Sequence, residues 1–230
     1  MKNATKIAGL VFLAFCLLDI IFVATGHEEL RYYSKPLLMP SLALAALLQL
    51  FPENKGVLSC LLLAGMLFHA AGDTLLLFDS KGFVFFAAGL GAFMIGHWFY
   101  LLVLLHGIGG AGGWKGALCI AVPIVLAPVI VGFFGLDWPL SGVVTVYALT
   151  LLYLVSSGVL WSMRGRRFAV RVILGGAIFI VSDTLLALNA FAGTDFPTRH
   201  SLVMITYLTA EWLLVSAMVR TIQAEVQRER

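Results

Sequence analysis

Charged residues are scarce in this chain, and their scarcity limits what kind of protein it can be. Only 12% of the 230 residues are charged and 61% are hydrophobic, with a mean hydropathy of +1.00. Soluble globular domains are roughly half apolar and a quarter charged. The composition therefore excludes a soluble globular domain and indicates a polytopic membrane protein.

Cysteines are few, and the sequence signatures of soluble enzymes are missing. Cys16, Cys60 and Cys119 lie in different apolar segments without a Cys-x-x-Cys spacing, which excludes a disulfide framework and a thiolate metal site. The chain has no Gly-x-Ser-x-Gly, no His-Glu-x-x-His and no phosphate-binding glycine loop. The net charge of +3 comes from basic residues gathered at segment ends, so we predict no nucleic-acid partner.

Apolar runs of about 20 residues, bounded by charged or turn residues, are what the chain does contain. Such runs cross a bilayer as helices, because a helix satisfies its own backbone hydrogen bonds in lipid. We predict an all-α, polytopic transmembrane helical bundle that forms a single domain over residues 1–230. The eight predicted helices cover residues 6–25, 35–51, 56–78, 82–105, 114–134, 139–163, 169–191 and 199–221.

The lysines and arginines predict the orientation of these helices. Eleven of the 15 fall on one side of the predicted bundle, and the other four are Arg31, Lys35, Lys81 and Arg199. Because cytoplasmic segments carry the excess of basic residues, we expect both termini in the cytoplasm. No cleavable leader pattern precedes the first run, so we expect that run to be a retained helix, in a bacterial inner membrane.

Two segments place an aspartate inside an apolar run. Residues 69–77 read His-Ala-Ala-Gly-Asp-Thr-Leu-Leu-Leu, and residues 181–188 read Val-Ser-Asp-Thr-Leu-Leu-Ala-Leu. A carboxylate at membrane depth is costly and usually functional. If Asp73 and Asp183 face one cavity, they do not both ionise near neutral pH, which leaves an acid beside a base. The alternative interpretation is helix-to-helix hydrogen bonding or an ion site.

Two basic residues are expected near the carboxyl groups. His69 precedes Asp73 by four residues and so shares its helix face, where it either orients the carboxylate or makes an ordinary interhelical hydrogen bond. Lys35, with Arg31 just before it, opens the second predicted helix at the outer boundary. We expect Lys35 or Arg31 either to meet a lipid phosphate or to snorkel as a membrane anchor.

Other polar side chains fall inside the predicted helices. His97 and Tyr100 share a face, and we expect them nearer the inner side of the membrane than the aspartates. There, Tyr100 is either a site residue or an interfacial aromatic anchor. Asp19, Tyr207 and Glu211 are expected in the middle or outer half of the membrane. Asn189 is a further polar residue on the seventh predicted helix.

Several of these residues, with their neighbours, match a known pattern. The pieces are Lys35-Pro36, Gly72-Asp73 with the following leucines, Gly91-Ala92-Phe93 to Gly96-His97 with Tyr100, Ser182-Asp183 with Leu186, and Tyr207-x-x-Ala210. In order and spacing they resemble the lysoplasmalogenases, also called YhhN-like proteins. The resemblance spans the second to the eighth predicted helix. It departs from the family pattern at Glu211, where Gln is favoured, so this chain carries an added carboxyl group.

The resemblance implies an integral membrane hydrolase that cleaves the vinyl ether bond at sn-1 of lysoplasmalogens. The products would be a fatty aldehyde and glycerophosphoethanolamine or glycerophosphocholine. It also implies that Asp73 and Asp183 are the catalytic pair, and we expect no metal and no cofactor. The expected partners are the lysophospholipid substrate and membrane lipid. The predicted substrate-binding or supporting residues are Lys35, His69, His97, Tyr100, Asn189, Tyr207 and Glu211.

The chemistry of a vinyl ether fits a pair of carboxyl groups. Protonation of its β-carbon gives an oxocarbenium ion, which water captures as a hemiacetal that then collapses. This sequence needs an acid and a base, as oxocarbenium chemistry does in glycosidases. We expect Asp183 to donate the proton and Asp73 to be ionised, because a cationic His69 would favour the carboxylate; the reverse order is the alternative.

Three other functions fit parts of the sequence. A proton-coupled transporter also uses intramembrane carboxyl groups, although the runs around Asp73 and Asp183 lack the helix breaks of many transporters. An intramembrane zinc hydrolase would need His69, His97 and an aspartate together, and the different expected depths of the two histidines argue against it. A membrane scaffold would use the same polar residues only to join helices.

Overall fold

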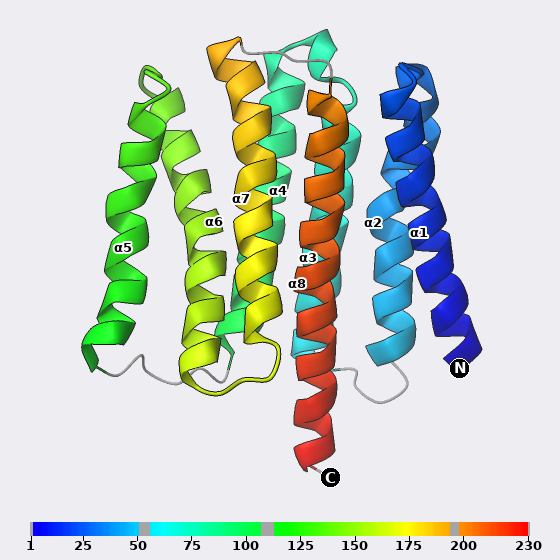
Figure 1. The fold of residues 1–230 in the computed structure, drawn as a ribbon, viewed down its shortest axis with the longest axis vertical. Helices are drawn as coiled ribbons and strands as arrows, with labels where there is room; N and C mark the ends of the chain where they lie inside the picture. Colours follow the sequence, from blue (N-terminus) through cyan, green and yellow to red (C-terminus); the bar gives the residue numbers. More distant parts are fainter. Residues whose placement is uncertain (1, 51–55, 107–112, 194–197, 230) are drawn as a thin grey trace. The chain divides into compact units, whose positions relative to one another are not determined.

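The fold is helical throughout the part of the chain that the computed structural model describes, which is residues 2–50, 56–106, 113–193 and 198–229. The side chains of residues 2, 189, 228 and 229 are outside that description. Within it, the all-α prediction is confirmed (Figure 1). The helices are α1 Lys2–Ala24, η1 Glu28–Leu30, α2 Arg31–Leu50, α3 Val57–Leu76, η2 Asp79–Lys81, α4 Phe83–Leu105, α5 Gly113–Gly132, α6 Leu140–Met163, α7 Ala169–Ala192 and α8 Arg199–Glu229, where η1 and η2 are short 3-10 helices.

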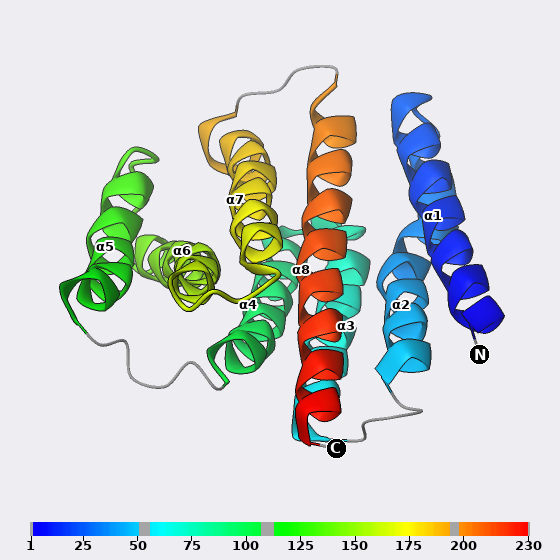
Figure 2. The same cartoon turned by 60° about the horizontal axis from the view of Figure 1, so that its bottom comes forward.

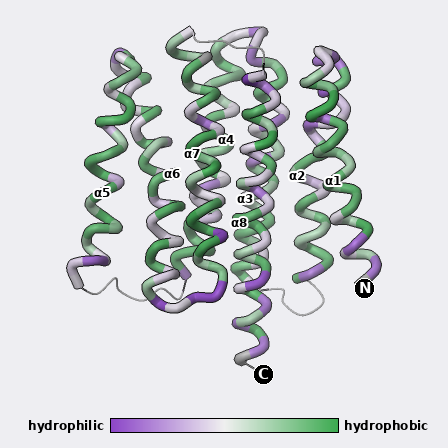
Figure 3. The backbone as a smooth tube through the Cα atoms, in the orientation of Figure 1, coloured by the Kyte–Doolittle hydropathy of each residue, from purple (hydrophilic) through white to green (hydrophobic). Residues whose placement is uncertain are grey.

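Most of these helices are long and apolar enough to cross a membrane. Among the described residues seven meet that condition, and α2 is the α-helix that does not. The prediction of a bundle of about eight helices is confirmed by the eight α-helices of the described residues, seven of which meet this measure. The first turns of α2 hold Arg31, Ser34 and Lys35, and they lower its apolar content. Hydrophobic residues follow the length of the helices in Figure 3, and hydrophilic ones gather at several ends. The chain is an integral, multi-pass membrane protein.

Three helix boundaries differ clearly from the predicted ones. α1 begins at Lys2 rather than residue 6. α2 begins at Arg31 rather than residue 35, because Arg31 and Ser34 are buried against a neighbouring helix instead of lying in a connection. α8 ends at Glu229 rather than residue 221, because its polar last residues keep the helical conformation after the apolar run stops. The other helix ends differ from prediction by a few residues at most.

The chain divides into two compact units. The first comprises Met1–Val103 with Met218–Arg230, and the second comprises Leu104–Ala217. The prediction of one domain over residues 1–230, and that of two cytoplasmic termini, stay predictions.

The first unit places α2 between α1 and α3. α2 packs along both helices (Figures 1 and 2). Gly65 of α3 lies against Tyr100 of α4, and Gly72 lies against Phe93. Residue numbers therefore rise along α3 where they fall along α4, which shows that the two helices run antiparallel. The end of α8 joins this unit through a hydrogen bond from the Gln223 amide to the carbonyl oxygen of Gln49, 3.0 Å long. Asp73 therefore lies on a helix that is packed on two sides.

The second unit places α6 between α5 and α7, which Figures 1 and 2 both show. The α6–α7 contact is close at Gly158, where an added Cβ would stand 2.7 Å from the backbone nitrogen of Ile173. At the other side, the Trp161 indole donates a 2.7 Å hydrogen bond to the carbonyl oxygen of Leu104, near the end of α4. That bond satisfies a helix-end carbonyl, which has no partner within its own helix. α7, which carries Asp183, is thus held firmly by α6.

Candidate active site

Asp73 lies near the end of α3 and is almost completely buried, with 1% of its surface exposed. Its Oδ1 is 4.0 Å from the Nζ of Lys35, which α2 brings from the neighbouring helix. Lys35 is itself only 7% exposed. The alternative in which Lys35 is an exposed, snorkelling anchor is therefore corrected, because its side chain is buried beside the aspartate. The expectation that Lys35 meets a lipid phosphate stays a prediction.

A second acid–base contact lies on the same end of α2. The Ser34 hydroxyl donates a 2.7 Å hydrogen bond to Oδ1 of Asp19 on α1, and Arg31 Nε is 3.5 Å from the same oxygen. Asp19 is fully buried, and Arg31 is 8% exposed. Because Arg31 and Lys35 are four residues apart, they lie on one helix face. This face of α2 therefore offers two cations to two carboxyl groups, one on each neighbouring helix.

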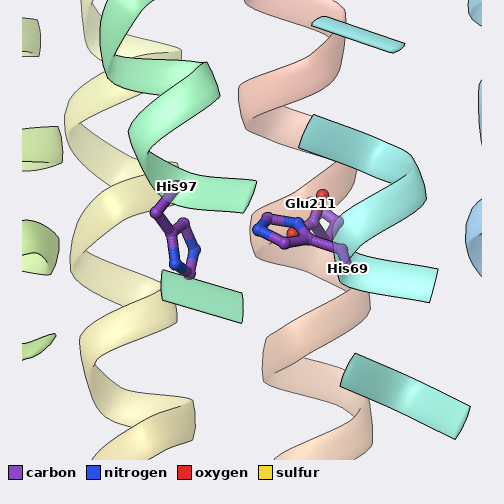
Figure 4. A group of neighbouring side chains, drawn as sticks. All are labelled: His69, His97 and Glu211. Atoms are coloured by element: carbon purple, nitrogen blue, oxygen red, sulfur yellow. The ribbon is translucent and has the colours of Figure 1, made fainter. Parts of the chain in front are cut away.

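His69 and His97 are neighbours, which corrects the predicted difference in depth. Their ring centroids are 4.5 Å apart, and both side chains are fully buried. Figure 4 shows His69 coming from α3 and His97 from α4. Helical side chains lean toward the N-terminus of their own helix. Because α3 and α4 are antiparallel, the two histidines consequently lean toward each other. Their rings therefore lie closer together than their positions along the two helices predict.

Tyr100 belongs to the same cluster and is not an interfacial anchor. It is fully buried, and its ring meets His69 edge-on at a centroid distance of 4.8 Å. The close approach of the helices depends on glycine. An added Cβ at Gly96 would overlap the His69 ring, and one at Gly65 would stand 2.7 Å from the Tyr100 ring. The Gly96-His97 and Tyr100 positions of the sequence pattern therefore build one aromatic cluster with His69.

The two imidazoles bear on the zinc interpretation. A catalytic zinc typically takes three protein ligands and a water, and His69 and His97 lie close enough together to supply two of them. The argument from different depths is therefore wrong, and metal binding is a question for direct measurement.

Asp183 lies in the middle of α7 and is half-buried, less enclosed than Asp73. The hydroxyl of Tyr147 on α6 donates a 2.5 Å hydrogen bond to its Oδ2. Tyr147 is 7% exposed. Next to the aspartate, the hydroxyl of Ser182 donates a 3.1 Å hydrogen bond to the carbonyl oxygen of Val203 on α8. The Ser182-Asp183 pair is thus attached to α8 through the serine and to α6 through the aspartate.

Tyr207 and Glu211 share a buried face of α8. Tyr207 is 5% exposed and meets Phe179 of α7 edge-on at 5.7 Å between centroids. Glu211 is fully buried. Asn189, the other predicted residue of this unit, has a side chain outside the described residues.

Sequence reasoning missed Tyr147. A tyrosine in the interior of an apolar run, with Thr145 and Thr150 close by in the sequence, is the signal that would have selected it. It also missed Ser34, whose side chain bonds Asp19. In each case the sequence selected the carboxyl group but not the hydroxyl group that binds it.

Comparison with known proteins agrees with the sequence pattern. The model of the YhhN family matches residues 30–218. That range holds Lys35, Asp73, the histidine pair, Tyr147 and Asp183, whose contacts are described above. A search of the curated proteins and a search of the solved structures found no match. On the family match, which covers most of its length, this chain belongs to the YhhN family.

Proposed function

We propose that this membrane protein is a lysoplasmalogenase, which hydrolyses the sn-1 vinyl ether bond of a lysoplasmalogen to a fatty aldehyde and a glycerophosphoalcohol. The observation that carries the proposal is the match to the YhhN family together with buried Asp73 in contact with Lys35. A buried charged pair is costly to keep in a membrane protein. Its presence in the segment that matches the family supports a chemical role for Asp73.

The reaction requires proton transfer to carbon and then capture by water. In this proposal the two carboxyl groups of the Asp-Thr-Leu-Leu segments, Asp73 and Asp183, act as the acid and the base. General acid–base catalysis by a positioned side chain contributes on the order of 10²–10⁴ in rate. We therefore expect each carboxyl group to matter by about that factor. The membrane concerned is proposed to be a bacterial inner membrane.

The test is aldehyde release from a vinyl ether lysophosphatidylethanolamine by the detergent-purified full chain. Asp73→Asn and Asp183→Asn should each lower kcat by roughly 10²–10⁴. The double variant should lose little more than the worse single variant, because residues that act as one unit are strongly non-additive. In ²H₂O, the aldehyde should carry one deuterium at carbon 2 for each turnover.

Matched controls are available on each unit. Asp79 and Asp137 are exposed, so Asp79→Asn and Asp137→Asn should leave aldehyde release unchanged. An inactive wild type that is folded would contradict the proposal. Asp73→Asn and Asp183→Asn variants as active as the controls would refute the role of the carboxyl groups.

The transporter interpretation predicts the opposite outcome of this assay, with no aldehyde released. Transporters often place their site at interrupted helices. α3 and α7, the helices that carry the two aspartates, run unbroken as Val57–Leu76 and Ala169–Ala192 and contain no proline. Nothing in these two helices favours the transporter over the hydrolase.

A further inference from the structure

The connection between α6 and α7, with the first turn of α7, holds a cluster of arginines. Its four members lie within eight residues: Arg164, Arg166, Arg167 and Arg171. Between Leu140 and Ser182 the sequence has no Asp or Glu to compensate them. Figure 3 shows this connection as hydrophilic, next to two largely hydrophobic helices. The arginine cluster therefore places four positive charges at one end of the second unit.

The backbone of the connection is fixed by the end of α6. The amide of Arg166 donates a 2.9 Å hydrogen bond to the carbonyl oxygen of Trp161, and the amide of Gly165 donates a 3.0 Å bond to that of Ser162. Gly165 has a φ of 64°. These two bonds and a left-handed glycine make a Schellman motif, a common end of an α-helix. The arginines therefore start from a defined turn.

Aromatic rings hold two of the guanidinium groups. The Cζ of Arg171 is 5.5 Å from the ring centre of Phe168 and 6.0 Å from that of Trp212 on α8, and its Nη1 donates a 3.4 Å hydrogen bond to Ser216. The Cζ of Arg167 is 6.0 Å from the same Phe168 ring. Neither arginine forms an ion pair with a carboxyl group of the described residues. Because a guanidinium group has five N–H donors, each keeps donors for an anion.

The surface beside these arginines is apolar and exposed. Val170 and Leu174 of α7 are 64% and 48% exposed, and they share a helix face because they are four residues apart. The ring of Trp212 is half exposed as well. Arginine beside exposed aromatic and aliphatic side chains at a helix end is typical of the membrane interface. This surface fits a ligand with a negative head and an apolar tail.

We propose that the arginine cluster binds the phosphate of an anionic phospholipid from the surrounding leaflet, with an acyl chain along Val170 and Leu174. Guanidinium groups match phosphate oxygens in pairs, and clusters of four or more basic residues next to a spanning helix favour anionic lipids. A zwitterionic headgroup adds an ammonium group, which the cluster repels. The inference goes beyond the proposed hydrolysis and does not depend on it.

Lipid preference is tested by thermal unfolding of the full chain in detergent. A ligand that binds the folded state raises Tm. Phosphatidylglycerol should therefore raise Tm more than phosphatidylcholine with the same acyl chains, and the difference should shrink at high salt, which screens exposed charges. Equal shifts with the two lipids would overturn the inference, because they would show that the acyl chains alone account for binding.

The residues are tested by measuring the affinity for phosphatidylglycerol with native mass spectrometry. Arg167 is exposed, so Arg167→Gln should fold, and it should lower the affinity about fivefold, as expected for one basic residue at a membrane surface. Adding Arg171→Gln should lower it about fivefold again, and Arg167→Lys should lose less than Arg167→Gln.

The control for these variants is Lys115→Gln. Lys115 is exposed, belongs to the same unit and also contacts an aromatic ring, that of Trp114 at 5.7 Å. This variant should keep the wild-type affinity. If Lys115→Gln and Arg167→Gln weaken binding equally, the lipid responds to the net charge of the protein and the arginine cluster is not its site.

Two further measurements locate the lipid and test its tail. A phosphatidylglycerol with a photoreactive headgroup should label the peptide that holds Arg167 and Arg171, and labelling spread evenly over all helix ends would overturn the assignment. Glycerol 3-phosphate, which has the phosphate but no acyl chain, should compete poorly. Equal competition would mean that the cluster is a site for soluble anions. These measurements need no enzymatic activity, so a wild type that releases no aldehyde leaves the inference intact.

Discussion

Gly96 of α4 lies directly against the imidazole of His69 on α3. A Cβ built at Gly96 would overlap the His69 ring and stand 2.9 Å from the carbonyl oxygen of Gly65. Close backbone approach of this kind is how small residues join helices in membranes. The His69 side chain can therefore occupy this position in the first unit only because residue 96 is a glycine and has no side chain.

Gly96→Ala should destabilise the protein. Overpacking typically costs about 1–3 kcal/mol, and one neighbour at Gly96 is backbone, which does not move cheaply. We expect a lower Tm in detergent and a changed His69 environment by NMR. Gly91 on the same helix has open space around its Cβ position, so Gly91→Ala is the matched control and should be neutral or slightly stabilising. Equal Tm values for the two variants would show that the α3–α4 contact at Gly96 has room for a methyl group, which would contradict the prediction.

The pair formed by Arg31 and Asp19 should behave as a coupled unit. Removing one partner of a buried pair leaves an uncompensated charge and can cost about 3–5 kcal/mol. We expect Asp19→Asn and Arg31→Gln each to lower Tm. The two single losses should add up to more than the loss in the double variant, because each single variant leaves one partner unpaired. The double-mutant cycle from thermal unfolding should give a coupling energy of about 0.5–3 kcal/mol. A coupling energy near zero would mean that the 3.5 Å contact contributes nothing.

The indole of Trp161 should stabilise the second unit through its hydrogen bond to Leu104. Trp161→Phe keeps an aromatic ring but leaves the carbonyl oxygen of Leu104 without this donor. The expected cost is about 1–3 kcal/mol, seen as a lower Tm. Trp114 is 70% exposed, and Trp114→Phe should have no such effect. If both variants unfold at the wild-type temperature, the bond at 2.7 Å is not significant for stability.

Chelation should leave aldehyde release unchanged, because the proposed acid–base steps use only carboxyl groups and water. The measurement is activity after dialysis against a strong chelator, together with metal analysis of the purified protein. His69 and His97 make the experiment necessary, since their rings are 4.5 Å apart and zinc commonly binds histidine pairs. Lost activity that stoichiometric zinc restores would favour the metal interpretation.

The helices were largely predictable, because long apolar runs are bounded by charged residues or turns. α6 and α7 begin and end within a residue or so of the predicted limits. The misjudged ends are those where polar residues remain helical. Arg31 starts α2 because its charge is satisfied by Asp19, and the tail of α8 is polar yet continues the helix. The pattern of apolar residues predicts neither the start of α2 nor the end of α8.

Contacts between helices were much less predictable. The sequence selects Asp73, His69, His97 and Tyr100 as polar or aromatic residues within apolar runs. The structure brings the rings of the last three together in the first unit. The burial of Lys35 was missed because it depends on how α2 is rotated against α3. Tyr147 was missed because its bond to Asp183 depends on the packing of α6 against α7, which neither helix reveals alone.

The length of α8 has a practical consequence. Its 31 residues correspond to about 46 Å of helix at 1.5 Å per residue, whereas a bilayer's hydrocarbon layer is about 30 Å thick. With Arg199 at one membrane boundary, we expect roughly the last ten residues, rich in Arg, Glu and Gln, to extend beyond the lipid as a helical rod. A fluorescent reporter joined to the C-terminus would start on that rod rather than on a loose linker, and its polarisation would follow the tumbling of the helix itself.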